Sequence, residues 1–177
     1  VIIVGEVRGK EAYSLFQAMT TGHLSYSTVH ASDMHSLIQR LENPPISLPR
    51  ALLTSLDTIV FLNSVIVKGN PVRRITNVTE IIELDAGTNR LVTMSPFEWI
   101  GGSEDRFQNN GASRLLYKIR VENGWSDAEL HHELQTRMDV LEWMKKQNLR
   151  SYTDVGKIVG TYMKDPDSIL QTIKRDS

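Results

Sequence analysis

The stretch VIIVGEVRGKEAYSLFQAMTTGHLSYSTVHA, residues 1–31, decides the fold of this chain. It begins with VIIV, an apolar, β-branched run typical of a strand covered on both faces, and such strands occur mainly in parallel sheets. Residues 10–23 space their apolar side chains as a helix does, and Gly22 stands where that helix is expected to stop. A β-prone stretch follows from Ser25 to Ala31. The order strand, helix, strand predicts an α/β fold.

The pattern continues with a second helix, for which Ser32 is the predicted N-cap. Prolines at positions 44, 45 and 49 end this helix, and RALLTSLD, residues 50–57, is expected to form a short one. Three strand-like segments come next, separated by the turn sequences GNP and AGTN, and they comprise TIVFLNSVIV, RRITNVTEIIEL and RLVTMSPFEWI. Short turns between neighbouring strands predict antiparallel pairing.

The last part of the chain reads as helical. SEDRFQNNGAS, residues 103–113, is polar and predicts a loop. SDAE at 126–129 is a capping box ahead of a helix, and DPDS at 165–168 starts another with Pro166 at its first position. The long helix carries a predicted apolar series, namely Leu130, Leu134, Met138, Leu141 and Met144. We expect a core over residues 1–102 and a helical region over residues 103–177.

The composition excludes several classes of protein. The 177 residues are 40% hydrophobic and 23% charged, which suits a globular domain. There is no cysteine, so disulfides and cysteine zinc sites are excluded and a reducing compartment is expected. The 20 basic and 21 acidic residues nearly cancel, which argues against a nucleic-acid partner. The apolar runs are too short for membrane insertion.

Two polar residues follow the two predicted parallel strands. Glu6 comes just after the first strand, and His30 lies near the end of the second. Open α/β sheets bind ligands outside the carboxyl ends of their strands, so both side chains are expected in one crevice. A carboxylate there can order an attacking water or hold hydrated Mg²⁺, and an imidazole can donate to a phosphate oxygen. Either residue alone is more often structural, so the hypothesis depends on their order and spacing.

These residues also carry a family resemblance. VIIVGEVRGKEAYSLFQAMTTGHLSYSTVHA resembles the Walker B and His-box segments of the secretion-superfamily ATPases, the motors of type II secretion, type IV pili and the archaeal flagellum. IQRLENPPISLPR, residues 38–50, looks most like the archaeal branch. The resemblance implies the C-terminal portion of a RecA-like P-loop ATPase core with antiparallel strands added, followed by a helical tail.

The resemblance further implies roles for individual residues. Glu6 would be the catalytic glutamate that polarises water, and Arg8 would structure the rim of the site. The nucleotide-coupling candidates are Thr21, His23, Thr28 and His30, and the inter-subunit candidates are Arg40 and Arg50. The parent protein would use ATP and Mg²⁺, form a hexamer, bind a membrane platform protein and lie in the cytoplasm at the inner face of the cell membrane.

The chain departs from the family pattern at the phosphate loop. A Walker A motif has the form G-x-x-x-x-G-K-[ST], and the only near match is GEVRGKE at residues 5–11. It has one residue too few between its glycines, and Glu11 stands at the hydroxyl position, where a carboxylate would repel phosphate. We therefore expect that the chain begins inside a domain, at the Walker B strand, and that it binds no nucleotide tightly by itself.

Two further hypotheses belong to other classes of protein. The same fold can serve as a non-catalytic assembly module that packs subunits into a ring or engages a membrane platform protein through the helical tail. Separately, an unpaired apolar edge makes the VIIV strand an expected place for self-association. Alternatively, His23, His30, Asp33 and His35 can be read as the cluster of a metal-dependent hydrolase, although their spacing matches no zinc template. We favour the ATPase hypothesis and expect no metal held by protein ligands alone.

Overall fold

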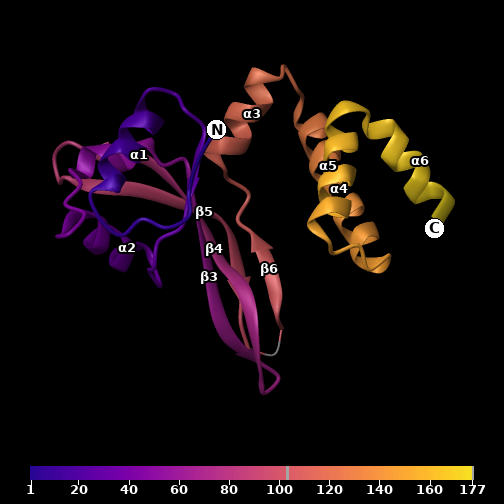
Figure 1. Ribbon diagram of the computed structural model, residues 1–177, viewed down its shortest axis with the longest axis horizontal. Coiled ribbons are helices and arrows are strands. Elements are labelled where there is room, and N and C mark those ends of the chain that lie inside the picture. Colours follow the sequence, from indigo (N-terminus) through magenta and orange to yellow (C-terminus); the bar gives the residue numbers. More distant parts are fainter. Residues whose placement is uncertain (103, 177) are drawn as a thin grey trace. The chain divides into compact units, whose positions relative to one another are not determined.

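Two short parallel strands, joined by a helix, begin the chain (Figure 1). The structure is a computed structural model that describes residues 1–102 and 104–176. Strand β1 (Ile2–Val4) pairs in parallel with β2 (Ser25–Ser27), and α1 (Glu11–Thr20) connects them. The predicted parallel pair is confirmed. The prediction that β1 is covered on both faces is wrong, because Ile3 is 76% exposed and β1 pairs with β2 alone among the described residues.

The first two helices have well-defined ends. Gly22 follows α1 with a φ of 86°, and the N–H of His23 donates to the carbonyl oxygen of Ala18, so the predicted glycine stop is confirmed. Helix α2 (Met34–Glu42) is capped by Asp33 instead of the predicted Ser32. Asp33 is the N-cap because its carboxylate accepts the N–H of Ser36 at 2.8 Å. The Ser36 hydroxyl in turn accepts the backbone N–H of Asp33, which completes a capping box.

A four-stranded antiparallel sheet follows, in the order β3-β4-β5-β6. After a single 3₁₀-helix, η1 (Arg50–Ser55), the strands are β3 (Thr58–Val67), β4 (Asn70–Asp85), β5 (Arg90–Ile100) and β6 (Arg106–Asn109). The three predicted strands and their antiparallel pairing are confirmed. The loop predicted over residues 103–113 is wrong where β6 pairs with β5, and residue 103 itself lies outside the described residues.

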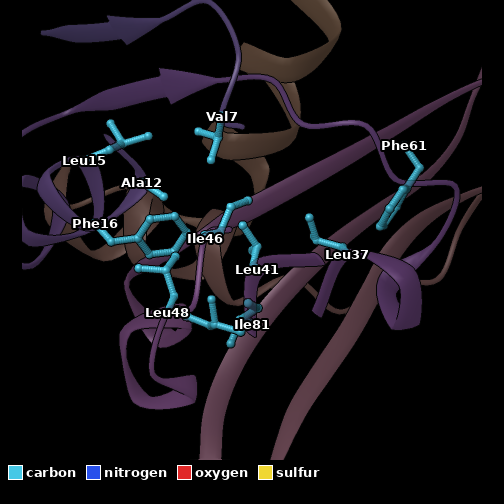
Figure 2. Packing of buried hydrophobic residues seen from close by; sticks show 11 residues of the cluster. Val7, Ala12, Leu15, Phe16, Leu37, Leu41, Ile46, Leu48, Phe61 and Ile81 are labelled. Carbon is cyan, nitrogen blue, oxygen red and sulfur yellow. The ribbon is translucent and has the colours of Figure 1, made fainter. Parts of the chain in front are cut away.

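One apolar core holds this first unit together (Figure 2). Helix α1 contributes Ala12, Leu15 and Phe16, and α2 contributes Leu37 and Leu41; Figure 2 shows these side chains as members of one cluster. The other members are Val7, Ile46, Leu48, Leu53, Phe61 and Ile81. Val7 lies in the loop directly after β1, so the segment that carries the flanking polar residues is anchored by a buried side chain.

The chain divides into two units between Tyr117 and Lys118, within helix α3 (Arg114–Glu122). Three more helices follow it, namely α4 (Asp127–Lys146), α5 (Tyr152–Lys164) and α6 (Pro166–Asp176). The capping box of Ser126 and Glu129 is confirmed, as is the start of α6 at Pro166.

The second unit has its own small core. Its buried side chains are Val140, Met144, Ile158, Tyr162 and Ile169. The predicted apolar series on α4 is partly wrong, because Met138 and Leu141 are exposed whereas Thr136 and Val140 are buried. Val140 and Met144 of α4 belong instead to the same buried cluster as Ile169 of α6. No helix within residues 1–102 and 104–176 has the length and apolarity needed to cross a membrane.

Candidate functional site

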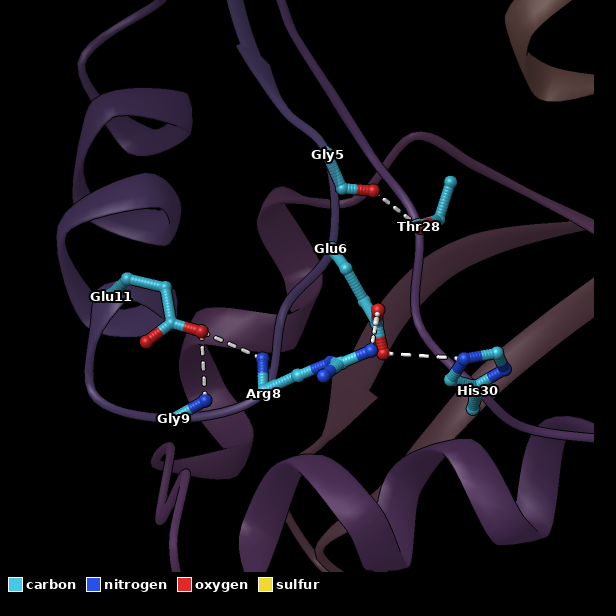
Figure 3. A network of polar contacts seen from close by, with 7 residues as sticks. All are labelled: Gly5, Glu6, Arg8, Gly9, Glu11, Thr28 and His30. Carbon is cyan, nitrogen blue, oxygen red and sulfur yellow. Dashed lines mark hydrogen bonds and ion pairs between the residues drawn. The ribbon is translucent and has the colours of Figure 1, made fainter.

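The carboxyl ends of β1 and β2 bring three of the predicted site side chains together (Figure 3). Glu6 follows β1 and His30 follows β2, so the parallel pairing places both at one edge of the two-stranded sheet. Arg8 Nη2 lies 2.6 Å from Glu6 Oε2, and His30 Nε2 lies 3.3 Å from Glu6 Oε1. The carboxylate therefore stands between a guanidinium and an imidazole, as the strand order predicts for Glu6 and His30.

The Glu6 side chain is the least exposed member of this group. It is 22% exposed, whereas the side chains of Arg8 and His30 are 71% and 79% exposed. The hydrogen bond from Arg8 lowers the pKa of the Glu6 carboxyl; desolvation opposes that shift, and the charges of Arg8, His30 and Arg40 reinforce it. Glu6 Oε1 is enclosed and accepts no hydrogen bond from the described residues, so it has a lone pair available for an added donor.

Hydrogen bonds between the two strand ends fix the loop that carries Glu6. The hydroxyl of Thr28 donates to the Gly5 carbonyl oxygen at 2.6 Å, and the N–H of Val7 donates to the Thr28 carbonyl oxygen at 2.8 Å. These bonds lie on either side of Glu6 in the chain. Thr28 therefore holds the backbone of the site, while its neighbour His30 contacts the carboxylate directly.

Glu11 fills the position where the near match to a phosphate loop would hold an anion. Its Oε1 accepts the N–H of Arg8 at 2.6 Å and that of Gly9 at 2.8 Å (Figure 3). Backbone N–H groups are what a phosphate loop offers to phosphate, and here they are already occupied by a side-chain carboxylate. These bonds from Arg8 and Gly9 lower the pKa of Glu11. The sequence pattern places Glu11 at the hydroxyl position of the near match, but it carries no signal that Glu11 accepts these two backbone N–H groups.

Thr21 and His23 lie apart from the Glu6 group. Both precede β2, so they stand at the amino edge of the parallel pair, whereas Glu6 and His30 stand at the carboxyl edge. His23 Nδ1 lies 3.1 Å from the Thr21 hydroxyl oxygen and 3.2 Å from the Ala18 carbonyl oxygen. The structure thus places these two residues in the C-terminal cap of α1.

The two arginines predicted at a subunit interface have different surroundings. Arg40 is exposed in the last turn of α2, and its charge helps lower the pKa of Glu6. Arg50 forms a two-point ion pair with Glu42, and its Nη1 donates to the Asn89 carbonyl oxygen at 2.8 Å. Arg50 therefore ties η1 to α2 and to the turn before β5, whereas Arg40 belongs to the electrostatic surroundings of the site.

The described residues contain no group of three or more histidine, aspartate or glutamate side chains that would hold a metal ion. At the carboxyl edge, Glu11 is engaged with backbone N–H groups and Glu6 contacts Arg8 and His30, so neither of these two carboxylates is free of protein partners.

Two family models match the chain in tandem. The model of the type II/IV secretion system protein family matches residues 1–87, which include β1, β2 and the Glu6 group. The model described as PilB3-like, C-terminal, matches residues 103–177. The chain belongs to the family of type II/IV secretion system proteins, and its second part is a PilB3-like C-terminal domain.

Three proteins of Methanocaldococcus jannaschii, each described as uncharacterized, are similar to this chain. Protein MJ1287 is 41% identical over 140 residues, which is 79% of this chain and 52% of the relative. MJ0900 is 33% identical over 165 residues, and MJ0781 is 26% identical over 147 residues. The matched region spans about half of the first relative's length, 30% of the second's and 20% of the third's.

Proposed function

We propose that this chain contributes the water-activating part of the nucleotide site of a secretion-superfamily ATPase. The observation that carries the proposal is the position of Glu6, whose carboxylate stands at the carboxyl edge of a parallel strand pair with one enclosed oxygen free of hydrogen bonds. Membership of the type II/IV secretion family supports a role in secretion or in assembly of a pilus or archaellum-like filament. Under this proposal the chain is part of a RecA-like core.

The roles of the side chains follow from their geometry. Glu6 would accept a proton from the water that attacks the γ-phosphate, because it combines a free lone pair with a fixed backbone. His30, which is exposed and adjacent to the carboxylate, would donate to a phosphate oxygen and so report the state of the nucleotide. Arg40 adds positive charge on the same side. Mg²⁺ would enter with ATP.

Other parts of the parent protein would complete the site. None of the 177 residues form a G-x-x-x-x-G-K-[ST] motif, and the amides of the near match are occupied by Glu11. The family context favours self-association, for which we propose a hexamer, and a membrane platform protein as partner. We place the assembly in the cytoplasm, at the inner face of the membrane.

A non-catalytic assembly module is the second proposal. The exposure of Ile3 on β1 favours it, because an apolar strand with a free edge is a ready surface for pairing with other protein. Under this proposal the Glu6 group would only stabilise the loop after β1. The two proposals differ in whether the Glu6 carboxylate is needed for turnover.

ATP hydrolysis by the full-length protein, including a phosphate loop, separates them. Replacing Glu6→Gln removes the proton acceptor and keeps the size of the side chain, so we expect kcat to fall by about 10²- to 10⁴-fold with ring assembly intact. Glu83→Gln is the matched control, since Glu83 is an exposed glutamate on β4. An E6Q protein that hydrolyses ATP within twofold of the wild-type rate would refute the catalytic proposal and favour the assembly module.

A further inference from the structure

The backbone of Arg8 is fixed, although its side chain is exposed. Its N–H donates to Glu11 Oε1 at 2.6 Å, and the preceding residue, Val7, is buried and bonded to the Thr28 carbonyl oxygen. The following N–H, that of Gly9, is held by the same Glu11 oxygen. Arg8 is therefore a pivot: its backbone is fixed by hydrogen bonds at three consecutive residues, and its long, exposed side chain reaches back to the Glu6 carboxylate (Figure 3).

Among the described residues, Glu6 is the only partner of the Arg8 guanidinium. The contact joins one terminal nitrogen to one carboxylate oxygen at 2.6 Å. A guanidinium has five N–H donors, so most of those of Arg8 are left to solvent. An ion pair whose cation is 71% exposed is weak and readily exchanged for a better anion.

This contact suppresses the basicity of Glu6. The hydrogen bond and charge of Arg8 lower the pKa of the carboxyl, and a weaker base takes a proton from water less readily. Arg8 also occupies Oε2, while Oε1 is enclosed beside His30. In the ligand-free chain the proposed general base is thus neutralised by a neighbour two residues away.

We propose that Arg8 acts as a lock on Glu6, by which we mean that its ion pair keeps the carboxylate from acting as a base. A polyphosphate that binds at the carboxyl edge of β1 and β2 would draw the Arg8 guanidinium away and so release Glu6. This inference rests on the proposed function and adds regulation to the same site. A polyphosphate presents several oxygens that match the planar guanidinium in a bidentate manner, so it competes well against the single contact to Glu6. The pivot keeps Arg8 within reach of both anions. Transfer of the guanidinium would free Oε2 in addition to Oε1 and would make the carboxylate a stronger base only when substrate is present.

The charged groups around the Glu6 carboxylate determine how its pKa would change when Arg8 moves away. Glu6 faces Arg8 on its own loop, His30 after β2 and Arg40 on α2, whereas Glu11 faces the backbone of Arg8. Moving Arg8 onto a polyphosphate removes the largest influence that lowers the pKa of Glu6, and it brings negative charge nearby. The pKa of Glu6 should therefore rise on release.

The test is an NMR titration of the side-chain carboxyl carbon of Glu6 in this chain, with and without inorganic tripolyphosphate and without metal. We expect a Glu6 pKa below its ordinary value in the free chain, an increase when tripolyphosphate is added, and a simultaneous shift of the Arg8 Nε–Hε signal. In Arg8→Ala, Glu6 should titrate near its ordinary pKa and respond less to tripolyphosphate. Arg8→Lys, which keeps the charge but loses the planar fork, should respond to an intermediate degree.

Arg73→Ala is the matched control, because Arg73 is an exposed arginine on β4, and it should behave as the wild type does. The lock is overturned if tripolyphosphate leaves the Glu6 pKa unchanged, or if it raises that pKa equally in wild type and Arg8→Ala. The two proposals fail separately. Persistent hydrolysis by E6Q would remove the catalytic proposal, whereas an unresponsive Glu6 in this chain would remove only the lock.

Discussion

Glu80 is a buried carboxylate that fixes the start of helix α3. It lies on β4 with 3% exposure, and its Oε1 accepts the Ser113 hydroxyl at 2.6 Å. Its Oε2 accepts the N–H of Arg114 at 2.7 Å and that of Leu115 at 3.2 Å. These two N–H groups belong to the first turn of α3, where a helix leaves its donors unpaired and favours negative charge. The carboxylate thus links the sheet to the helix that continues into the second unit.

Replacing Glu80→Gln should loosen this first turn without creating a cavity. Hydrogen bonds to a charged group contribute about 1.5–3 kcal/mol against about 0.5–1.5 for neutral ones, so weakening the bonds to two backbone donors loses about 2 kcal/mol. Loss of the charge at the helix N-terminus adds up to about 1 kcal/mol. The opening free energy of the turn should fall by about 2–3 kcal/mol, which is about a 30- to 150-fold change in an equilibrium constant.

Amide hydrogen exchange measured by NMR reads this change residue by residue. The amides of Arg114 and Leu115 should exchange faster in Glu80→Gln by about the factor given above, whereas those of β3 should be much less affected. Glu83→Gln, on an exposed position of the same strand, should leave all of these rates unchanged. Exchange of Arg114 and Leu115 within threefold of wild type would refute the role assigned to Glu80.

Three other predictions follow from individual contacts. Hydrogen bonds from Arg74 and Trp99 lower the pKa of Asp105 to about 2. The ionised Asp105 therefore stabilises the folded chain fully above its ordinary pKa of 3.8, and this contribution is lost as the pH falls through 2. Denaturant melts from pH 5 to 2 should show the loss of stability, and Asp105→Asn should make stability depend less on pH in that range. Leu53→Ala in the core should lower the free energy of unfolding by about 3 kcal/mol, whereas exposed Leu24→Ala should change it by less than about 0.5; a Leu53→Ala loss below about 1 kcal/mol would contradict the packing. Gly160→Ala should stabilise α5 by about 0.5–1 kcal/mol in thermal melts, since a Cβ there meets nothing within 4 Å, and a loss of stability would argue against that open space.

Local patterns predict much of the fold, because their physical causes are local. The strands at 58–67 and 90–100 have the predicted bounds, since β-branched runs between turn residues specify extended backbone. Gly22 and the Ser126 capping box are similarly decided within a few residues. Strand β6 is different. Its four residues are all exposed and only Phe107 is apolar; its pairing partner is β5, with the Arg74 to Asp105 ion pair beside it.

Exposure of side chains was harder to predict than secondary structure. A run such as VIIV specifies a strand but does not specify what packs on it, so the exposure of Ile3 is not visible in the sequence. Helix α4 shows the same limit. The sequence pattern favours burial of Met138 and Leu141, whereas tertiary packing leaves both exposed and buries Val140.

The candidate site is predictable as far as the topology of parallel strands allows. That topology predicts that Glu6 and His30 meet, and they do. Residues that precede β2 lie at the opposite edge of the parallel pair, so Thr21 and His23 are separated from the Glu6 group. This separation becomes evident once the register of β1 and β2 is known. The contact of Arg8 with Glu6 depends on side-chain conformation, for which the sequence pattern carries no signal.

The central claim is that this chain holds the water-activating part of a nucleotide site and not the phosphate-binding part. Calorimetric titration with Mg-ATP tests it most directly, on this chain and on a longer chain of the same protein that includes a G-x-x-x-x-G-K-[ST] loop. We predict tight binding by the longer chain and only weak binding by residues 1–177, since Glu11 occupies the amides of Arg8 and Gly9. Tight binding by residues 1–177 alone would contradict the account.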